Sequence, residues 1–163
     1  MGTQRITPCL WFDGDAVEAA EFYCSLFDGA RVTGTTLYNE AGPGEPGSVV
    51  TVTWELEGTE YVGINGGPEF PFTEAVSFQV ACEDQAEVDR LWTALTADGG
   101  QESVCGWLKD RFGLSWQIIP ATLPALIGDP DPERARRATE AMYAMRKIDI
   151  AEVQRAADAV PTA

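Results

Sequence analysis

Histidine is absent from the 163-residue sequence, and its absence removes the side chain that most often binds a transition metal or activates a nucleophile. A metal centre would have to be built from carboxylate, thiolate or amide donors alone. A catalytic cysteine would also lack the imidazole that commonly lowers the pKa of its thiol. The sequence therefore disfavours histidine-dependent metal sites and cysteine–histidine catalysis.

Long apolar runs and positive charge are also scarce. No stretch approaches the roughly 18 to 20 apolar residues that span a bilayer. Lys and Arg number 11 against 26 Asp and Glu, which gives a formal net charge of −15. Because nucleic-acid binding relies on cations that neutralise phosphates, we expect no nucleic-acid partner and no membrane partner. Residues 1–10 lack the apolar segment of a signal peptide, which favours a cytoplasmic protein.

The four cysteines form no CxxC pair. Cys9, Cys24 and Cys82 stand in apolar patterns, where a reduced thiol packs as a small hydrophobic group. Cys105 differs because it lies in the polar, Gly-flanked segment 103–106. It is a weak candidate for a catalytic nucleophile, and a structural thiol is the alternative.

A repeat with a spacing of 69 residues organises the chain. Asp15 and Glu18 open one amphipathic segment with a pattern like a capping box, and Asp84 and Glu87 open another in the same way. Apolar residues follow at helical intervals in both segments, and both end at glycine. We therefore predict two helices that descend from one duplicated unit.

Strand-like segments surround each predicted helix in the same order. In the first half they cover residues 6–12 before the helix, and 31–38, 48–56 and 60–65 after it. In the second half they cover 75–82 before the helix, and 101–105, 107–111 and 114–119 after it. Both halves read β-α-β-β-β, so the expected fold class is α+β, with two tandem βαβββ modules that form curved mixed sheets. The modules span residues 5–66 and 74–120 of a domain that covers 1–120.

Beyond Pro120 the pattern becomes helical and predicts an extension, residues 121–163, that packs on the domain. Its expected helices cover 121–127, 133–145 and 150–159. In the middle helix one side is apolar, and three arginines lie elsewhere: Arg134, Arg136 and Arg137. These arginines fit a solvated face paired with Glu133 and Glu140 better than an anion-binding cluster.

Several strings resemble the PhnB-like, or 3-demethylubiquinone-9 3-methyltransferase-like, branch of the vicinal-oxygen-chelate superfamily, which includes the glyoxalases. They cover residues 6–14, 18–23, 64–68, 81–84, 105–110 and 112–120, with two more at 129–132 and 145–150. The similarity extends over residues 5–157. It implies a glyoxalase-like fold with a cavity lined by the sheets, and either small-molecule binding or an enzymatic activity.

Metal-using members of that superfamily place a His or Gln on the first strand of each module and a Glu on the last. The resemblance places these positions at Ile6, Ala75 and Gln117 and within residues 62–65, which contain no carboxylate. We therefore expect no catalytic metal. No Gly-rich turn between a strand and a helix is present to hold a nucleotide-like group near the first strand, so no cofactor is expected.

Candidate ligand-binding residues are the polar and aromatic side chains of the predicted strands. Gln117 is the first candidate because it stands at a ligand position, and the others are Asn65, Ser77, Gln79, Trp11, Trp107 and Trp116. Asp110 is a weak catalytic candidate, although Asp110 and Gly113 also fit a hairpin turn. Lys109 fits an exposed edge lysine better than an anion site.

The sequence thus predicts a metal-free protein that binds a small apolar or aromatic molecule. The alternative is an enzyme, either methyltransferase-like as the branch is labelled or a lyase or isomerase. A homodimer is expected, with the helical extension packed against a second copy.

Overall fold

The computed structural model describes residues 4–159 and contains two compact units that divide between Phe72 and Thr73. Each unit contains a four-stranded sheet. None of the helices within residues 4–159 combines the length and the apolar composition needed to cross a bilayer.

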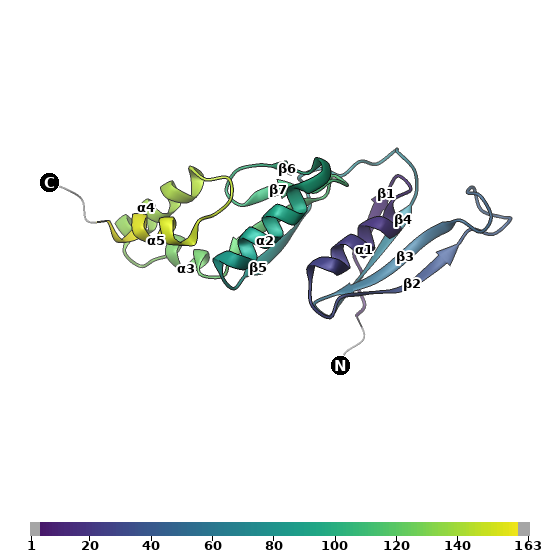
Figure 1. Cartoon of the computed structure of the whole chain (residues 1–163), viewed down its shortest axis with the longest axis horizontal. Coiled ribbons are helices and arrows are strands. Elements are labelled where there is room, and N and C mark those ends of the chain that lie inside the picture. The colour runs from purple at the N-terminus through teal and green to yellow at the C-terminus, as the bar shows by residue number, and fades with distance from the viewer. Residues whose placement is uncertain (1–3, 160–163) are drawn as a thin grey trace. The chain divides into compact units, whose positions relative to one another are not determined.

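The first unit is a β-α-β-β-β module (Figure 1). Its elements are β1 (Cys9–Phe12), α1 (Ala16–Leu26), β2 (Arg31–Leu37), β3 (Val49–Leu56) and β4 (Thr59–Asn65). The strand order is β1-β4-β3-β2, with β1 parallel to β4 and the other neighbours antiparallel. Helix α1 packs on β3, and Tyr23 from the helix and Trp54 from the strand are completely buried.

The second unit repeats this connectivity with β5 (Ser77–Cys82), α2 (Gln85–Thr96), β6 (Gln101–Glu102), β7 (Trp107–Lys109) and β8 (Ser115–Pro120). A single 3₁₀ turn, η1 (Ala97–Gly99), follows α2. The strand order β5-β8-β7-β6 matches that of the first sheet position by position, and β5 is parallel to β8. The predicted α+β fold of two βαβββ modules is therefore confirmed.

Strand β6 is shorter than the sequence suggests. The pattern predicts a strand over 101–105, but the ladder ends at Glu102. Cys105 has a left-handed backbone with φ of 57°, and its N–H donates to the carbonyl of Met145, while the Gly106 N–H donates to the carbonyl of Arg146. The Ser103 N–H still donates to the Trp107 carbonyl, but the backbone N–H groups of Cys105 and Gly106 bond to the C-terminal extension.

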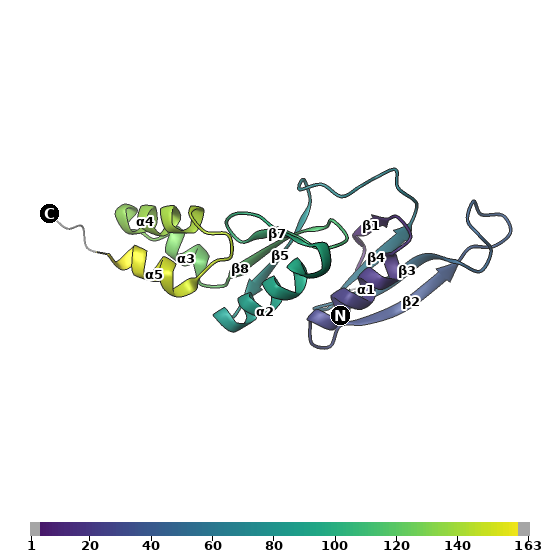
Figure 2. The ribbon, with the colours of Figure 1, turned by 45° about the horizontal axis from the view of Figure 1, so that its top comes forward.

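The extension contains α3 (Leu123–Ile127), α4 (Pro132–Tyr143) and α5 (Ile150–Asp158), which pack together beside the second sheet (Figure 2). A cluster of buried apolar side chains joins them to β8: Ile119, Leu123, Leu126, Ala138, Ile148, Val153 and Ala157. Gln85 at the start of α2 adds two hydrogen bonds, to the carbonyl of Ile148 and from the N–H of Ile150.

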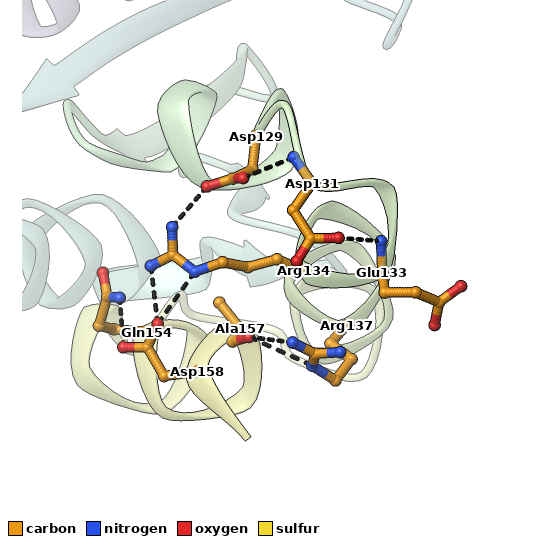
Figure 3. Close-up of polar contacts among 8 residues, drawn as sticks. All are labelled: Asp129, Asp131, Glu133, Arg134, Arg137, Gln154, Ala157 and Asp158. Carbon is orange, nitrogen blue, oxygen red and sulfur yellow. Dashed lines mark hydrogen bonds and ion pairs between the residues drawn. The ribbon is translucent and has the colours of Figure 1, made fainter. Parts of the chain in front are cut away.

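The arginines of α4 divide into two groups. Arg136 pairs with Glu133 and Glu140 on its own helix, as predicted. Arg134 instead reaches between Asp129 and Asp158, as Figure 3 shows. Arg137 donates to the backbone carbonyls of residues 156 and 157 at the end of α5. These two side chains connect α4 to α5, a role that helical periodicity does not reveal.

Candidate functional site

One face of the second sheet carries most of the predicted ligand-binding residues. Between β5 and β8 the register pairs Ser77 with Ser115 and Gln79 with Gln117. Between β7 and β8 it pairs Trp107 with Gln117 and Lys109 with Ser115. Side chains of paired residues lie on the same face of a sheet, and alternate residues along a strand share that face. We call this set the polar face: Ser77, Gln79, Trp107, Lys109, Ser115 and Gln117.

The opposite face of the same sheet belongs to the core. Phe78, Leu108 and Trp116 lie on it, and the rings of Phe78 and Trp116 meet edge to face with centroids 5.2 Å apart. Trp116 is only 1% exposed. The structure thus places Trp107 and Trp116 on opposite faces.

Gln117 lies at the centre of the polar face, between β5 and β7. Its Nε2 donates to Ser77 Oγ at 2.8 Å, so two of the predicted residues are in direct contact. Gln117 and Ser77 are half-buried, and Gln79 is exposed. This bond and the strand register together place Ser77, Gln79 and Trp107 next to Gln117.

A cavity of about 350 Å³ opens beside β6 and β7. It is lined by Glu74, residues 101–104, residues 107–109 and Ser115. Small-molecule sites in proteins occupy roughly 300 to 1,000 Å³, so this cavity has the size for a compact ligand. Trp107 is the predicted site residue that lines it.

The charged groups of the cavity are paired. Lys109 Nζ lies 2.6 Å from Glu74 Oε1, and this hydrogen bond holds the pKa of the Glu74 carboxyl below its usual value. Glu102 accepts from Trp92 Nε1 at 2.8 Å and lies 3.4 Å from Arg146. The Trp92 bond and the nearby Arg146 lower the pKa of Glu102 as well, so both carboxyls are ionised at neutral pH.

Ser115 lines the cavity, and its buried hydroxyl has no hydrogen-bond partner within residues 4–159. It is 1% exposed, and its Oγ makes no hydrogen bond within the described residues. An unmade hydrogen bond at a buried hydroxyl costs about 1 to 3 kcal/mol. Most buried polar groups in native structures have a hydrogen-bond partner, so the Ser115 hydroxyl is a candidate for a hydrogen bond to a ligand atom.

Asp110 holds a turn. Its Oδ1 accepts from the N–H groups of Phe112 and Leu114, and its Oδ2 accepts from Trp116 Nε1 at 2.8 Å. The Gly113 N–H donates to the Asp110 carbonyl, which confirms the predicted Asp-x-x-Gly turn. The side chain is 3% exposed and is directed at Trp116 in the core.

Asn65 and Trp11 belong to the first unit. Asn65 Oδ1 accepts from the Ala16 N–H, and its Nδ2 donates to the Val49 carbonyl, so both ends of the amide have structural partners. Trp11 Nε1 donates to the Gly67 carbonyl at 2.8 Å, and its ring meets Phe70 edge to face. Gly66 allows this contact, because a Cβ there would lie 2.1 Å from the indole.

Cys105 is half-buried on the turn between β6 and β7. Burial raises the pKa of its thiol, so the thiol is protonated at neutral pH. A nucleophilic cysteine needs the opposite shift.

The residues at the superfamily's metal positions do not fit a metal. Ile6 and Ala75 have no donor atom, and Gln117 offers one amide oxygen while its nitrogen is bonded to Ser77. Within residues 4–159, no three His, Cys, Asp or Glu side chains are grouped closely enough to hold an ion. No step of chemistry is therefore assigned to a metal at these positions.

The sequence analysis gave Glu74 and Ser115 no functional role, and at Lys109 it favoured an exposed edge lysine over an anion site. The period of two along 107–109 and 115–117 could have placed Lys109 and Ser115 on the face of Trp107 and Gln117. Glu74 had no such signal, because it stands in the turn before β5 and meets Lys109 only in the folded chain.

The two βαβββ modules have the layout of a glyoxalase-like protein of the vicinal-oxygen-chelate superfamily. Residues 4–119 match the model of the family described as 3-demethylubiquinone-9 3-methyltransferase, and the chain belongs to this family, the PhnB-like branch. The match ends before α3, so the part of the resemblance in the C-terminal extension stays a prediction.

Solved structures agree with this placement. A putative 3-demethylubiquinone-9 3-methyltransferase, a PhnB protein from Bacillus cereus, is 38% identical, with a TM-score of 0.66 over 72% of this chain and 100% of that one. Protein PA1353 from Pseudomonas aeruginosa shares the fold at 21% identity, with a TM-score of 0.58 over 70% of this chain and 95% of that one. No curated protein matches the chain.

Proposed function

We propose that this protein binds a small apolar or aromatic molecule in the cavity beside β6 and β7, without a catalytic metal. The observation that carries the proposal is the cavity of about 350 Å³, with Trp107 in its wall and the buried hydroxyl of Ser115 unpaired. An indole offers a flat apolar surface on which an aromatic ring can stack. A few polar groups beside such a surface fix the orientation of the ligand.

An enzymatic role is the second candidate, and the family description favours methyl transfer. The Bacillus cereus relative is likewise described as a putative 3-demethylubiquinone-9 3-methyltransferase. A methyltransferase would have to bind a methyl donor as well as an acceptor. The two candidates therefore differ in whether S-adenosylmethionine stabilises the folded protein.

Thermal unfolding tests both candidates. A ligand of the folded state raises the midpoint of unfolding, and the stabilisation grows with the logarithm of the ligand concentration relative to its Kd. We expect naphthalene- and phenol-type compounds to raise the midpoint of the wild type and to lose most of this effect in Trp107→Ala. Trp11→Ala, which removes a comparable indole from the first unit, is the matched control and should keep the effect.

The outcomes separate the candidates. If no aromatic compound shifts the midpoint at millimolar concentration, the binding proposal fails. If S-adenosylmethionine produces a saturable shift and a labelled methyl group appears in a phenolic acceptor, the enzymatic candidate replaces it.

We further propose that the protein is a cytoplasmic homodimer. Tyr143 at the end of α4 is 67% exposed and Ile127 at the end of α3 is 38% exposed, which supports contact of the extension with a second copy. Sedimentation velocity of the wild type against Tyr143→Glu tests this part: a change from dimer to monomer supports it, and a wild-type monomer overturns it.

A further inference from the structure

We propose that the ligand of this cavity carries a carboxylate, and that this group displaces Glu74 from Lys109 when the ligand binds. This inference rests on the proposed function, because it names the chemical class of the molecule that the cavity takes. The observation behind this inference is the ion pair in which the Glu74 carboxylate lies on Lys109 at the cavity wall.

In the ion pair between Lys109 and Glu74, the lysine is fixed on a strand, whereas the glutamate can move away. Lys109 stands on β7, and its side chain is 32% exposed. Glu74 stands in the turn before β5, and its side chain is 66% exposed. Exposed ion pairs contribute little to stability, so breaking this one costs little. A ligand carboxylate that also makes apolar contacts can therefore replace Glu74.

Ser115 gives the incoming group a second donor. It is the direct cross-strand partner of Lys109, so both side chains lie on the polar face at the cavity wall. Within the described residues the Ser115 hydroxyl has no hydrogen-bond partner, while Lys109 is paired with Glu74. A carboxylate has two oxygens and can accept from Lys109 and from Ser115 together, and hydrogen bonds to a charged acceptor are stronger than neutral ones.

The other charges of the cavity do not oppose an anion. Glu102 is the second carboxylate in the lining, and it is already engaged by Trp92 Nε1 and lies beside Arg146. Once Glu74 has left, Lys109 has no counter-ion among the residues that line the cavity within 4–159, because Glu102, the other lining carboxylate, pairs with Arg146. Trp107, two residues before Lys109 on the same strand, then provides the apolar surface for the rest of the ligand.

The experiment measures binding of 2-naphthoate and of its neutral analogue 2-naphthamide by titration calorimetry. We expect the wild type to bind the carboxylate about tenfold more tightly than the amide. Glu74→Gln should tighten naphthoate several-fold and leave naphthamide unchanged, because it removes the internal competitor. Lys109→Gln should abolish the preference for the carboxylate. Asp89→Asn is the matched control, because it removes a charge from the exposed Lys147–Asp89 pair outside the cavity lining, and it should change neither affinity.

Each outcome either supports or overturns the assignment of a carboxylate ligand. If naphthoate and naphthamide bind with equal affinity, or if Glu74→Gln weakens naphthoate, the carboxylate assignment is overturned while the proposed function stands. If neither compound binds the wild type or Glu74→Gln, both the assignment and the proposed function fail. If only Glu74→Gln binds, and prefers naphthoate, the displacement of Glu74 is supported.

Discussion

The side-chain oxygen of Asn65, at the end of β4, accepts a hydrogen bond from the backbone N–H of Ala16 at 2.9 Å and so caps the first turn of α1. Asp15, the residue that the repeat predicts as the cap, makes no side-chain capping bond. In the second module Asp84 caps α2 itself by accepting from the Glu87 N–H. The corresponding last residue of β8 is Pro120, which has no side-chain acceptor.

Replacing Asn65 by alanine should destabilise the first unit by about 2 kcal/mol, because the Ala16 N–H loses its acceptor and the Val49 carbonyl loses its donor. Asp15→Ala should change the free energy of unfolding by less than about 0.5 kcal/mol. Urea unfolding of the two variants measures both values. Equal effects would mean that Asn65 does not cap the helix.

Asp110→Ala should destabilise the second unit by about 3 kcal/mol or more, since three N–H groups lose a buried carboxylate acceptor. Asp110→Asn should have a smaller effect, because it keeps one carbonyl oxygen and fails only to accept from Trp116 at the other position. Chemical unfolding followed by near-ultraviolet circular dichroism of the tryptophans measures the difference. A stable, folded Asp110→Ala that had lost only ligand binding or turnover would instead support a catalytic role.

Much of the architecture could be predicted because it depends on local patterns. The spacing of Asp15 and Asp84 located both helices, and the period of two located the strands to within a few residues. The turn at Asp110 followed from Asp and Gly three residues apart. In each case the sequence signal and the structure involve the same few neighbouring residues.

The candidate site was predicted less completely because its main contacts join distant parts of the chain. The ion pair of Glu74 with Lys109 spans 35 positions, and the cap of Ala16 by Asn65 spans 49. The Cys105 N–H, in the turn after β6, bonds to the carbonyl of Met145 in the extension. No local pattern encodes such pairs, so the sequence could propose Gln117 and Trp107 but not the ion pair of Glu74 with Lys109.

Ser115 and Ser77 are cross-strand partners, but their replacement by alanine should change the stability in opposite directions. Ser115→Ala should stabilise the unliganded protein by about 1 kcal/mol, because a buried hydroxyl without a partner is removed. Ser77→Ala should destabilise it by about 1 kcal/mol, because Gln117 Nε2 loses its acceptor. Thermal and urea unfolding of both variants test the pair, and a loss of stability in Ser115→Ala would show that its hydroxyl has a partner in solution.

The cysteines should differ in reactivity toward a thiol reagent such as 5,5′-dithiobis(2-nitrobenzoate) at pH 8. Cys9 is exposed and should react first. Burial raises the pKa of the Cys105 thiol, and it raises that of Cys82 to about 12, so Cys105 should react slowly and Cys82 only on unfolding. Cys9→Ser should remove the fast phase. A fast phase that disappears instead in Cys105→Ser would identify an activated thiol on the turn between β6 and β7.

The connection between α4 and α5 through Arg134 should control the stability of the end of the chain. Arg134 donates to Asp158 through two nitrogens and also pairs with Asp129, so one guanidinium joins α5 to the start of α4 (Figure 3). Arg134→Gln should increase hydrogen exchange of α5 amides several-fold at pH 7. Arg136→Gln removes an arginine whose partners lie on α4 alone and is the matched control, with no effect expected on α5.

The effect of Arg134→Gln should also depend on pH. The hydrogen bonds from Gln154 and Arg134 lower the pKa of Asp158 from its usual 3.8, so the folded form binds its proton less readily than the unfolded form. The stabilisation is therefore fully present above about pH 5 and is lost as the pH falls through the lowered pKa. The difference in α5 exchange protection between wild type and Arg134→Gln should shrink as the pH is lowered from 5 to about 2.5. A difference that stays constant over this range would mean that Arg134 stabilises α5 by packing and not through the carboxylate of Asp158.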